Sequence, residues 1–192
     1  MVNRTLLALS ILCILSSPVW ADKNAGFAAA KRGDYETALR ELRPLADRGD
    51  AATQVFLGLM YSEGLGVKKD LVEATIWYRK AADQGDDSGQ FMLGISYVEG
   101  KGVTKDFAEA AIWLHKAADH GNIGAYGPLG VMYAKGQGVT QDYIQAHKWF
   151  SLAARKTKNP GSAITARDRI ASQMTPEELA EARRLAREWT PQ

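Results

Sequence analysis

Two similar stretches decide the fold: LGLMYSEGLGVKKDLVEATIWYRKAADQG at residues 57–85 and LGISYVEGKGVTKDFAEAAIWLHKAADHG at residues 93–121. When the chain is compared with itself at a shift of 36 residues, residues 51–86 and 87–122 are identical at 19 of 36 positions. Residues 87–122 and 123–158 are identical at 12 of 36 positions. Self-similarity at a fixed period of this length is the signature of a repeat protein, so the three blocks are duplicated units.

Each unit has the spacing of a helical hairpin. The columns that recur in residues 54–61 lie at i, i+3, i+4 and i+7, which is one face of a helix, and residues 71–82 show a second such face. A Gly-x-Gly-Val segment joins them, where we expect positive φ at the end of the first helix and a buried valine. N-cap residues, each contributing about 1 kcal/mol, stand at Asp50, Asp86, Asn122, Asp70, Asp106 and Asp142.

Small and aromatic residues recur in fixed columns of the units. Glycines at one column let neighbouring helices approach closely, and tryptophans at another fill the space between hairpins. These columns are Gly58, Gly94 and Gly130, and Trp77, Trp113 and Trp149. We therefore predict that the tryptophans belong to the core.

The first helix of the third unit departs from the pattern. Gly124, Gly127 and Pro128 interrupt it, and proline removes a hydrogen-bond donor and clashes with the preceding turn. We expect this helix to kink near Gly127 or to begin there afresh.

Further hairpins flank the three units. Residues 22–50 form a divergent hairpin that resembles a tetratricopeptide unit, with Gly33 as the break and Asp34 starting the second helix. Residues 159–192 are expected to form C-terminal capping helices. Thr175 and Glu178 make a capping box, which marks the start of the last helix. The apolar stripe of this helix runs from Leu179 to Trp189. Because an open array exposes its last apolar face, this helix is interpreted as a lid.

The first 21 residues have the features of a signal peptide. Arg4 gives a positive start, an apolar run follows, and Val19 and Ala21 place small residues at the positions that a signal peptidase recognises. We expect cleavage after Ala21 and export to the periplasm or beyond, with no stable membrane insertion afterwards, since the run is short for a membrane span. The chain's one cysteine, Cys13, would be removed with this segment.

Composition narrows the class of partner. The chain has 192 residues, 24 Lys and Arg against 22 Asp and Glu, and a formal net charge of +2. Without a basic block, nucleic acid is not an expected partner. A single cysteine excludes a disulfide framework and a multi-cysteine zinc site.

The repeating columns are similar to those of the Sel1-like repeat family, whose units read A-x-x-x-L-G-x-x-Y-x-x-G-x-G-V-x-x-D-x-x-x-A-x-x-W-x-x-x-A-A-x-x-G. The pattern starts at Leu57, at Leu93 and again at Leu129, where Thr157 replaces the closing glycine. The resemblance implies an all-α fold, a right-handed α-solenoid of helical hairpins that serves as a protein-binding scaffold. In bacteria such proteins are often exported and tied to the cell envelope, stress signalling or host contact.

The sequence carries no enzyme signature. Its serines have no catalytic motif around them, and the recurring aspartates are explained as helix caps. His115 and His120 occupy columns that accept solvated residues, whereas His147 lies about one turn from the level of His115 in the next unit. A two-histidine metal site is left open there, but no third ligand is apparent, so neither a metal nor a cofactor is predicted.

A partner is expected to lie along the first helices, on the concave side. In such stacks the first helix of every hairpin lines the inner curve. The predicted partner-binding residues are Phe56, Leu59, Glu63, Met92, Ile95, Glu99, Val131 and Lys135. Glu63 and Glu99 carry negative charge in the column where Lys135 carries positive charge, and this polarity of the groove would orient an extended peptide or a helix. The alternative for the apolar positions is packing between hairpins, and Arg79 and His115 represent the opposite, outer face.

Two classes of function follow. The first is an exported, non-catalytic scaffold or adaptor that binds a protein or peptide. The alternative is a binder or weak hydrolase of β-lactams or peptidoglycan-derived ligands, an activity that the resemblance implies for cysteine-rich members with a disulfide in each repeat.

Overall fold

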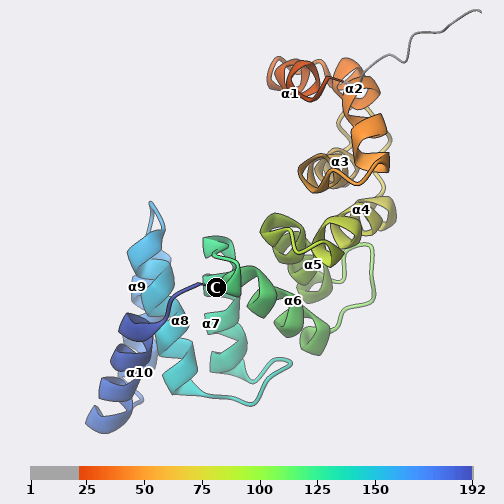
Figure 1. The fold of residues 1–192 in the computed structure, drawn as a ribbon. Helices are drawn as coiled ribbons and strands as arrows, with labels where there is room; N and C mark the ends of the chain where they lie inside the picture. Colours follow the sequence, from red (N-terminus) through yellow and green to blue (C-terminus); the bar gives the residue numbers. More distant parts are fainter. Residues whose placement is uncertain (1–21, 192) are drawn as a thin grey trace, which may run out of the picture.

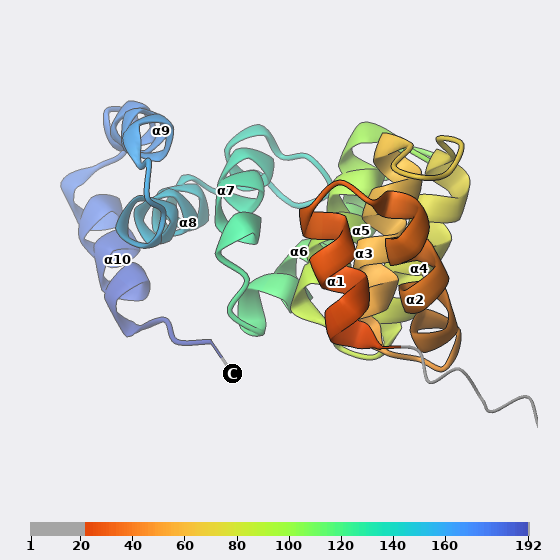
Figure 2. The same ribbon diagram turned by 90° about the horizontal axis from the view of Figure 1, so that it is seen from above.

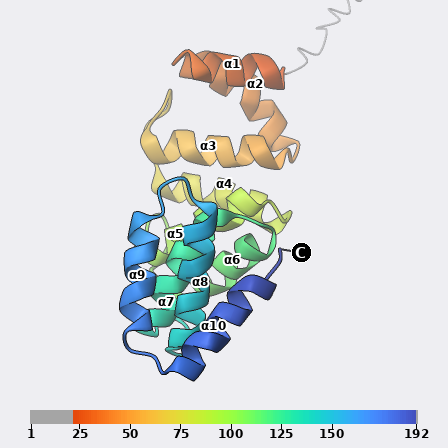
Figure 3. The same cartoon turned by 90° about the vertical axis from the view of Figure 1, so that its left-hand side faces the viewer.

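A computed structural model describes residues 22–191, which form ten α-helices and one short 3-10 helix. Their bounds are α1 Lys23–Lys31, α2 Tyr35–Asp47, α3 Ala51–Glu63, α4 Leu71–Asp83, α5 Asp87–Glu99, α6 Phe107–Asp119, η1 Ile123–Ala125, α7 Tyr126–Lys135, α8 Tyr143–Lys156, α9 Gly161–Ala171 and α10 Pro176–Glu188. The helices pack on one another in chain order as an α-solenoid (Figures 1 and 3). The predicted signal peptide lies outside the described residues, and none of the described helices is long and apolar enough to cross a bilayer.

The predicted caps are confirmed at both helices of each unit. The Asp70 carboxylate accepts from the backbone N–H groups of Val72 and Glu73, at 3.0 Å each. The equivalent residues act in the same way: Asp50, Asp86, Asp106, Asn122 and Asp142. The first glycine after each first helix is left-handed, with φ of +76° at Gly64. The valine of each link, however, is half-buried rather than buried.

The core lies between successive hairpins, as predicted. Trp77, Trp113 and Trp149 are all buried. The glycine column is packed against the second helix: a Cβ atom added at Gly94 would lie 2.8 Å from Cγ of Leu114. Since that distance is far below van der Waals contact, a small residue is required for the two helices to meet.

Polar bonds join each hairpin to the next. The second helix of one unit sends a side chain to the tyrosine hydroxyl on the first helix of the following unit. These pairs are Arg43 with Tyr61 (2.9 Å), Arg79 with Tyr97, and His115 with Tyr133 (3.1 Å). The prediction that Arg79 and His115 belong to the outer face is therefore wrong, because both turn into the joint between units. His115 is half-buried rather than solvated, and burial lowers its pKa.

The third unit is irregular where the sequence predicted it. The 3-10 helix η1 covers Ile123–Ala125, and α7 starts afresh at Tyr126. Pro128 thus falls in the first turn of α7, where its missing N–H has no partner to lose. The first helix of this unit is consequently shorter than α3 and α5.

The last helix covers the end of the array. Thr175 and Glu178 form the predicted capping box, and α10 packs against α8. The Trp189 ring lies 5.3 Å from the ring of Tyr126 and 5.6 Å from that of Trp149, between ring centroids. Figure 2 shows α8, α9 and α10 together at the end of the molecule opposite α1 and α2.

Candidate functional site

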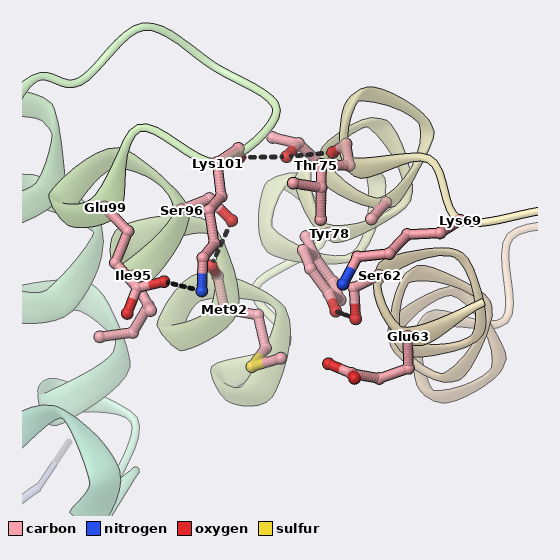
Figure 4. A pocket seen from close by; sticks show the side chains of 12 residues that line it. Ser62, Glu63, Lys69, Thr75, Tyr78, Met92, Ile95, Ser96, Glu99 and Lys101 are labelled. Atoms are coloured by element: carbon pink, nitrogen blue, oxygen red, sulfur yellow. Dashed lines mark hydrogen bonds and ion pairs between the residues drawn. The ribbon is translucent and has the colours of Figure 1, made fainter. Parts of the chain in front are cut away.

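A pocket of about 160 Å³ opens between the first and second units (Figure 4). Its walls come from the end of α3, the following loop, α4, the second half of α5 and the loop after α5. The first helices α3 and α5 also touch one another beside it. The lining residues are Ser62, Glu63, Lys69, Leu71, Ala74, Thr75, Tyr78, Met92, Ile95, Ser96, Glu99 and Lys101.

The pocket combines an apolar interior with charged side chains. Met92 and Ile95 present hydrocarbon and a thioether from α5, and Leu71 and Ala74 do so from α4. Lys101 forms an ion pair with Glu99 at 2.7 Å, and this hydrogen-bonded contact raises the pKa of the lysine. The pocket therefore places an apolar wall beside charged side chains.

Hydrogen bonds fix the walls of the pocket. The buried Thr75 hydroxyl donates to the carbonyl of Leu71 on its own helix (2.9 Å) and lies 3.1 Å from the carbonyl of Lys101 on the neighbouring unit. The Tyr78 hydroxyl lies 3.4 Å from Oγ of Ser62, and burial raises the pKa of the phenol. The loop that carries Lys101 is therefore held against α4 before any partner arrives.

Four of the eight predicted partner-binding residues meet in this pocket: Glu63, Met92, Ile95 and Glu99. Leu59, Val131 and Lys135 are exposed but lie outside it. Phe56 has a packing role instead, since its ring contacts that of Phe27 with centroids 5.2 Å apart. Phe56 packs against the apolar cluster that includes Ala29 and Leu57. This agrees with the alternative that apolar residues of the first helices pack between hairpins.

Several lining residues were missed by the sequence argument. Lys69 and Lys101 come from the loops, and Tyr78 comes from the second helix, whereas all the predicted residues belong to first helices. One signal was available: the residue between the two loop glycines changes from Leu65 to Lys101 to Gln137, while the glycines do not change. Lys101 is exposed, whereas Leu65 and Gln137 are half-buried, so this loop position accepts side chains of different size and polarity beside the pocket.

The histidines do not gather around one point. His115 contacts Tyr133, whereas the imidazole of His147 lies beside Ser151 on its own helix. Within residues 22–191 there is no group of three or more His, Cys, Asp or Glu side chains placed to hold a metal ion.

Comparison with known proteins identifies the repeats. The family model of the Sel1 repeat matches residues 51–86, 87–122 and 128–157. The chain belongs to the Sel1-repeat family. The third match begins only after η1, in keeping with the irregular start of that unit.

Two solved Sel1-type structures are similar over most of this chain. One is a protective antigen of uropathogenic Escherichia coli strains that displays an SLR fold, with 30% identity and a TM-score of 0.73. The other is a Sel1 repeat protein from Oxalobacter formigenes, with 29% identity and a TM-score of 0.67. They cover 85% and 86% of this chain, which spans 39% and 74% of theirs, respectively. No curated protein matches the chain.

Proposed function

We propose that this Sel1-repeat scaffold is a non-catalytic adaptor that binds a segment of a protein or peptide along its first helices. The pocket between α3 and α5 is the observation that carries the proposal. It would take up one apolar side chain of the partner against Met92 and Ile95. Burying a side chain of leucine size contributes about 1.5–3 kcal/mol, which is enough to set the position of an otherwise polar segment.

The charges beside the pocket support a directional contact. Glu63 and Glu99 stand at the ends of α3 and α5, and Lys135 stands at the end of α7 in the third unit. A bound segment that runs along these helices would meet negative charge first and positive charge last. Complementary charges of this kind fix the register of a bound segment, and a charge placed against one of its own sign costs affinity.

The cellular setting of the adaptor is also part of the proposal. Residues 1–21 have the sequence of a signal peptide, so the partner is expected in the periplasm or outside the cell, in a process of the envelope, stress response or host contact. A partner isolated from the envelope fraction would agree with this setting.

Exchanging the groove charges tests the proposal. The double variant Glu99→Lys with Lys135→Glu keeps the net charge, and we expect it to weaken partner binding roughly tenfold. Both side chains are exposed, so the melting temperature should stay close to that of the wild type. Binding is measured by calorimetric titration, with the partner that the mature protein captures from envelope extract.

A matched control separates the groove from net charge. Asp83→Lys with Lys158→Glu makes the same exchange at two exposed positions away from the pocket and should leave binding unchanged. Equal affinity in the two double variants would contradict the proposal that the partner binds along the first helices. Reproducible turnover of a chromogenic β-lactam or of peptidoglycan fragments, abolished by one point mutation, would contradict the non-catalytic role.

A further inference from the structure

A second cavity, of about 240 Å³, lies where the last repeat meets the capping helices. It is lined by His147 and Ser151 of α8, by Arg167, Asp168 and Ala171 of α9, and by Arg183 of α10. These three helices stand side by side at the end of the array away from α1 (Figures 1 and 3). Five of the six lining side chains are polar or charged.

His147 is the most buried of these side chains, with 3% of its surface exposed. Its Nδ1 atom lies 3.4 Å from Oγ of Ser151, at the long limit of a hydrogen bond. Among residues 22–191 no other hydrogen bond reaches the imidazole, and Nε2 is not among the buried side-chain atoms that lack a partner, so this nitrogen keeps solvent access. Nε2 can therefore exchange water for a ligand that enters the cavity.

One cationic side chain beside the cavity has no ion-pair partner among residues 22–191. Arg167 is paired with Asp168 at 2.7 Å, and Arg184, next to Arg183 in sequence, is tied to Glu181 and Glu188. Arg183 makes no ion pair with any residue between 22 and 191. The cavity thus holds two guanidinium groups and a single carboxylate.

The excess of positive charge around the cavity affects the pKa of the His147 imidazole. Burial lowers the pKa of His147 most strongly, and the charges of Arg167 and Arg183 lower it further, while Asp168 opposes them. Among residues 22–191, these are the titratable side chains that line the cavity besides the imidazole itself. A negative group placed among them would relieve the repulsion between the cations and would favour the protonated ring.

We propose that this cavity binds the oxyanion group of a small ligand, a phosphate or a carboxylate. Arg183 of α10 supplies a planar fork of N–H donors that matches either group, and Ser151 and His147 of α8 supply a hydroxyl and a ring nitrogen. Arg167 adds positive charge while it remains paired with Asp168. The bound group would link α8, α9 and α10, and so fasten the capping helices to the last repeat.

Calorimetric titration of the mature protein with inorganic phosphate and, separately, with malonate tests the site at constant ionic strength. We expect saturable binding of at least one of the two, and the preferred probe distinguishes a phosphate ligand from a carboxylate. Arg183→Gln should weaken that binding about tenfold or more, since it removes charge-assisted hydrogen bonds. Arg187→Gln, on the same exposed helix but outside the cavity, should leave binding unchanged.

The pH dependence gives a second readout. Sulfate keeps its charge between pH 5 and pH 8, so a change in its affinity reports on the protein. We expect tighter sulfate binding at pH 5 than at pH 8, and a flatter profile in His147→Gln. Absence of binding for all three anions, or equal loss in Arg183→Gln and Arg187→Gln, would overturn the proposal. An unfolded His147→Gln variant would leave the comparison of the two arginine variants to decide it.

Discussion

Replacing Gly102 by alanine is expected to destabilise the array by about 3–5 kcal/mol, which is a large part of the stability of a domain. Gly102 has a φ of +73°, in the left-handed region that residues with a Cβ atom avoid. An added Cβ would overlap the carbonyl oxygen of Leu71 and would lie 2.5 Å from Oγ1 of Thr75. The substitution therefore combines backbone strain with a clash at the wall of the pocket.

Alanine substitutions at two other glycines separate the cost of the positive φ from the cost of the clash. Gly33 has a φ of +81° but nothing within 4 Å of an added Cβ, so Gly33→Ala should cost only about 1–2 kcal/mol from strain. Gly127 lies in α7 with neither a positive φ nor a neighbour within 4 Å, and Gly127→Ala should stabilise by about 0.5–1 kcal/mol. Urea unfolding followed by circular dichroism measures all three. If Gly102→Ala is no less stable than Gly33→Ala, the close approach of the loop to α4 is wrong.

Deleting residues 175–192 is expected to lower the melting temperature by about 10 °C or more and to cause aggregation. The deletion removes α10 and Trp189, whose buried Ala182 and Ala186 face the last repeat. Tyr126 and Trp149 would lose the ring that packs on both of them. Each unit of a repeat array contacts only its neighbours, so the exposed apolar surface cannot be covered by another part of the chain.

A shorter deletion provides the control. Removing residues 190–192 keeps Trp189 and all of α10, and it should leave the melting temperature nearly unchanged. Differential scanning calorimetry and sedimentation velocity report the two effects separately. An unaltered melt and a monomeric state after removal of residues 175–192 would contradict the role of α10 as the lid of the array.

The parts of the fold that could be predicted from sequence have local causes. An aspartate such as Asp106 caps the helix that begins one residue later, and a glycine such as Gly64 ends the helix before it, so each is understood within a few residues. The 36-residue period then repeats the same local rules. Pro128 and its neighbouring glycines predicted the break in the third unit for the same reason.

The parts that could not be predicted depend on how one hairpin is rotated against the next. Arg79 and His115 contact tyrosines 18 residues further along the chain, in the next unit. The spacing of apolar residues within a helix does not show which of its sides faces the next unit. The same holds for the candidate site. Glu99 was predicted from its helix, but its partner Lys101 and the wall residue Tyr78 enter the pocket from other elements.

Site-specific photo-crosslinking tests directly whether a partner binds at the pocket between the first helices. A photoreactive amino acid is placed at Glu99, whose side chain is 42% exposed, or at Ile112 on α6, which is 49% exposed and outside the pocket. In envelope extract we expect one dominant adduct from position 99, suppressed by excess unlabelled wild-type protein, and no such adduct from position 112. The same adduct from position 112, with none from position 99, would contradict it.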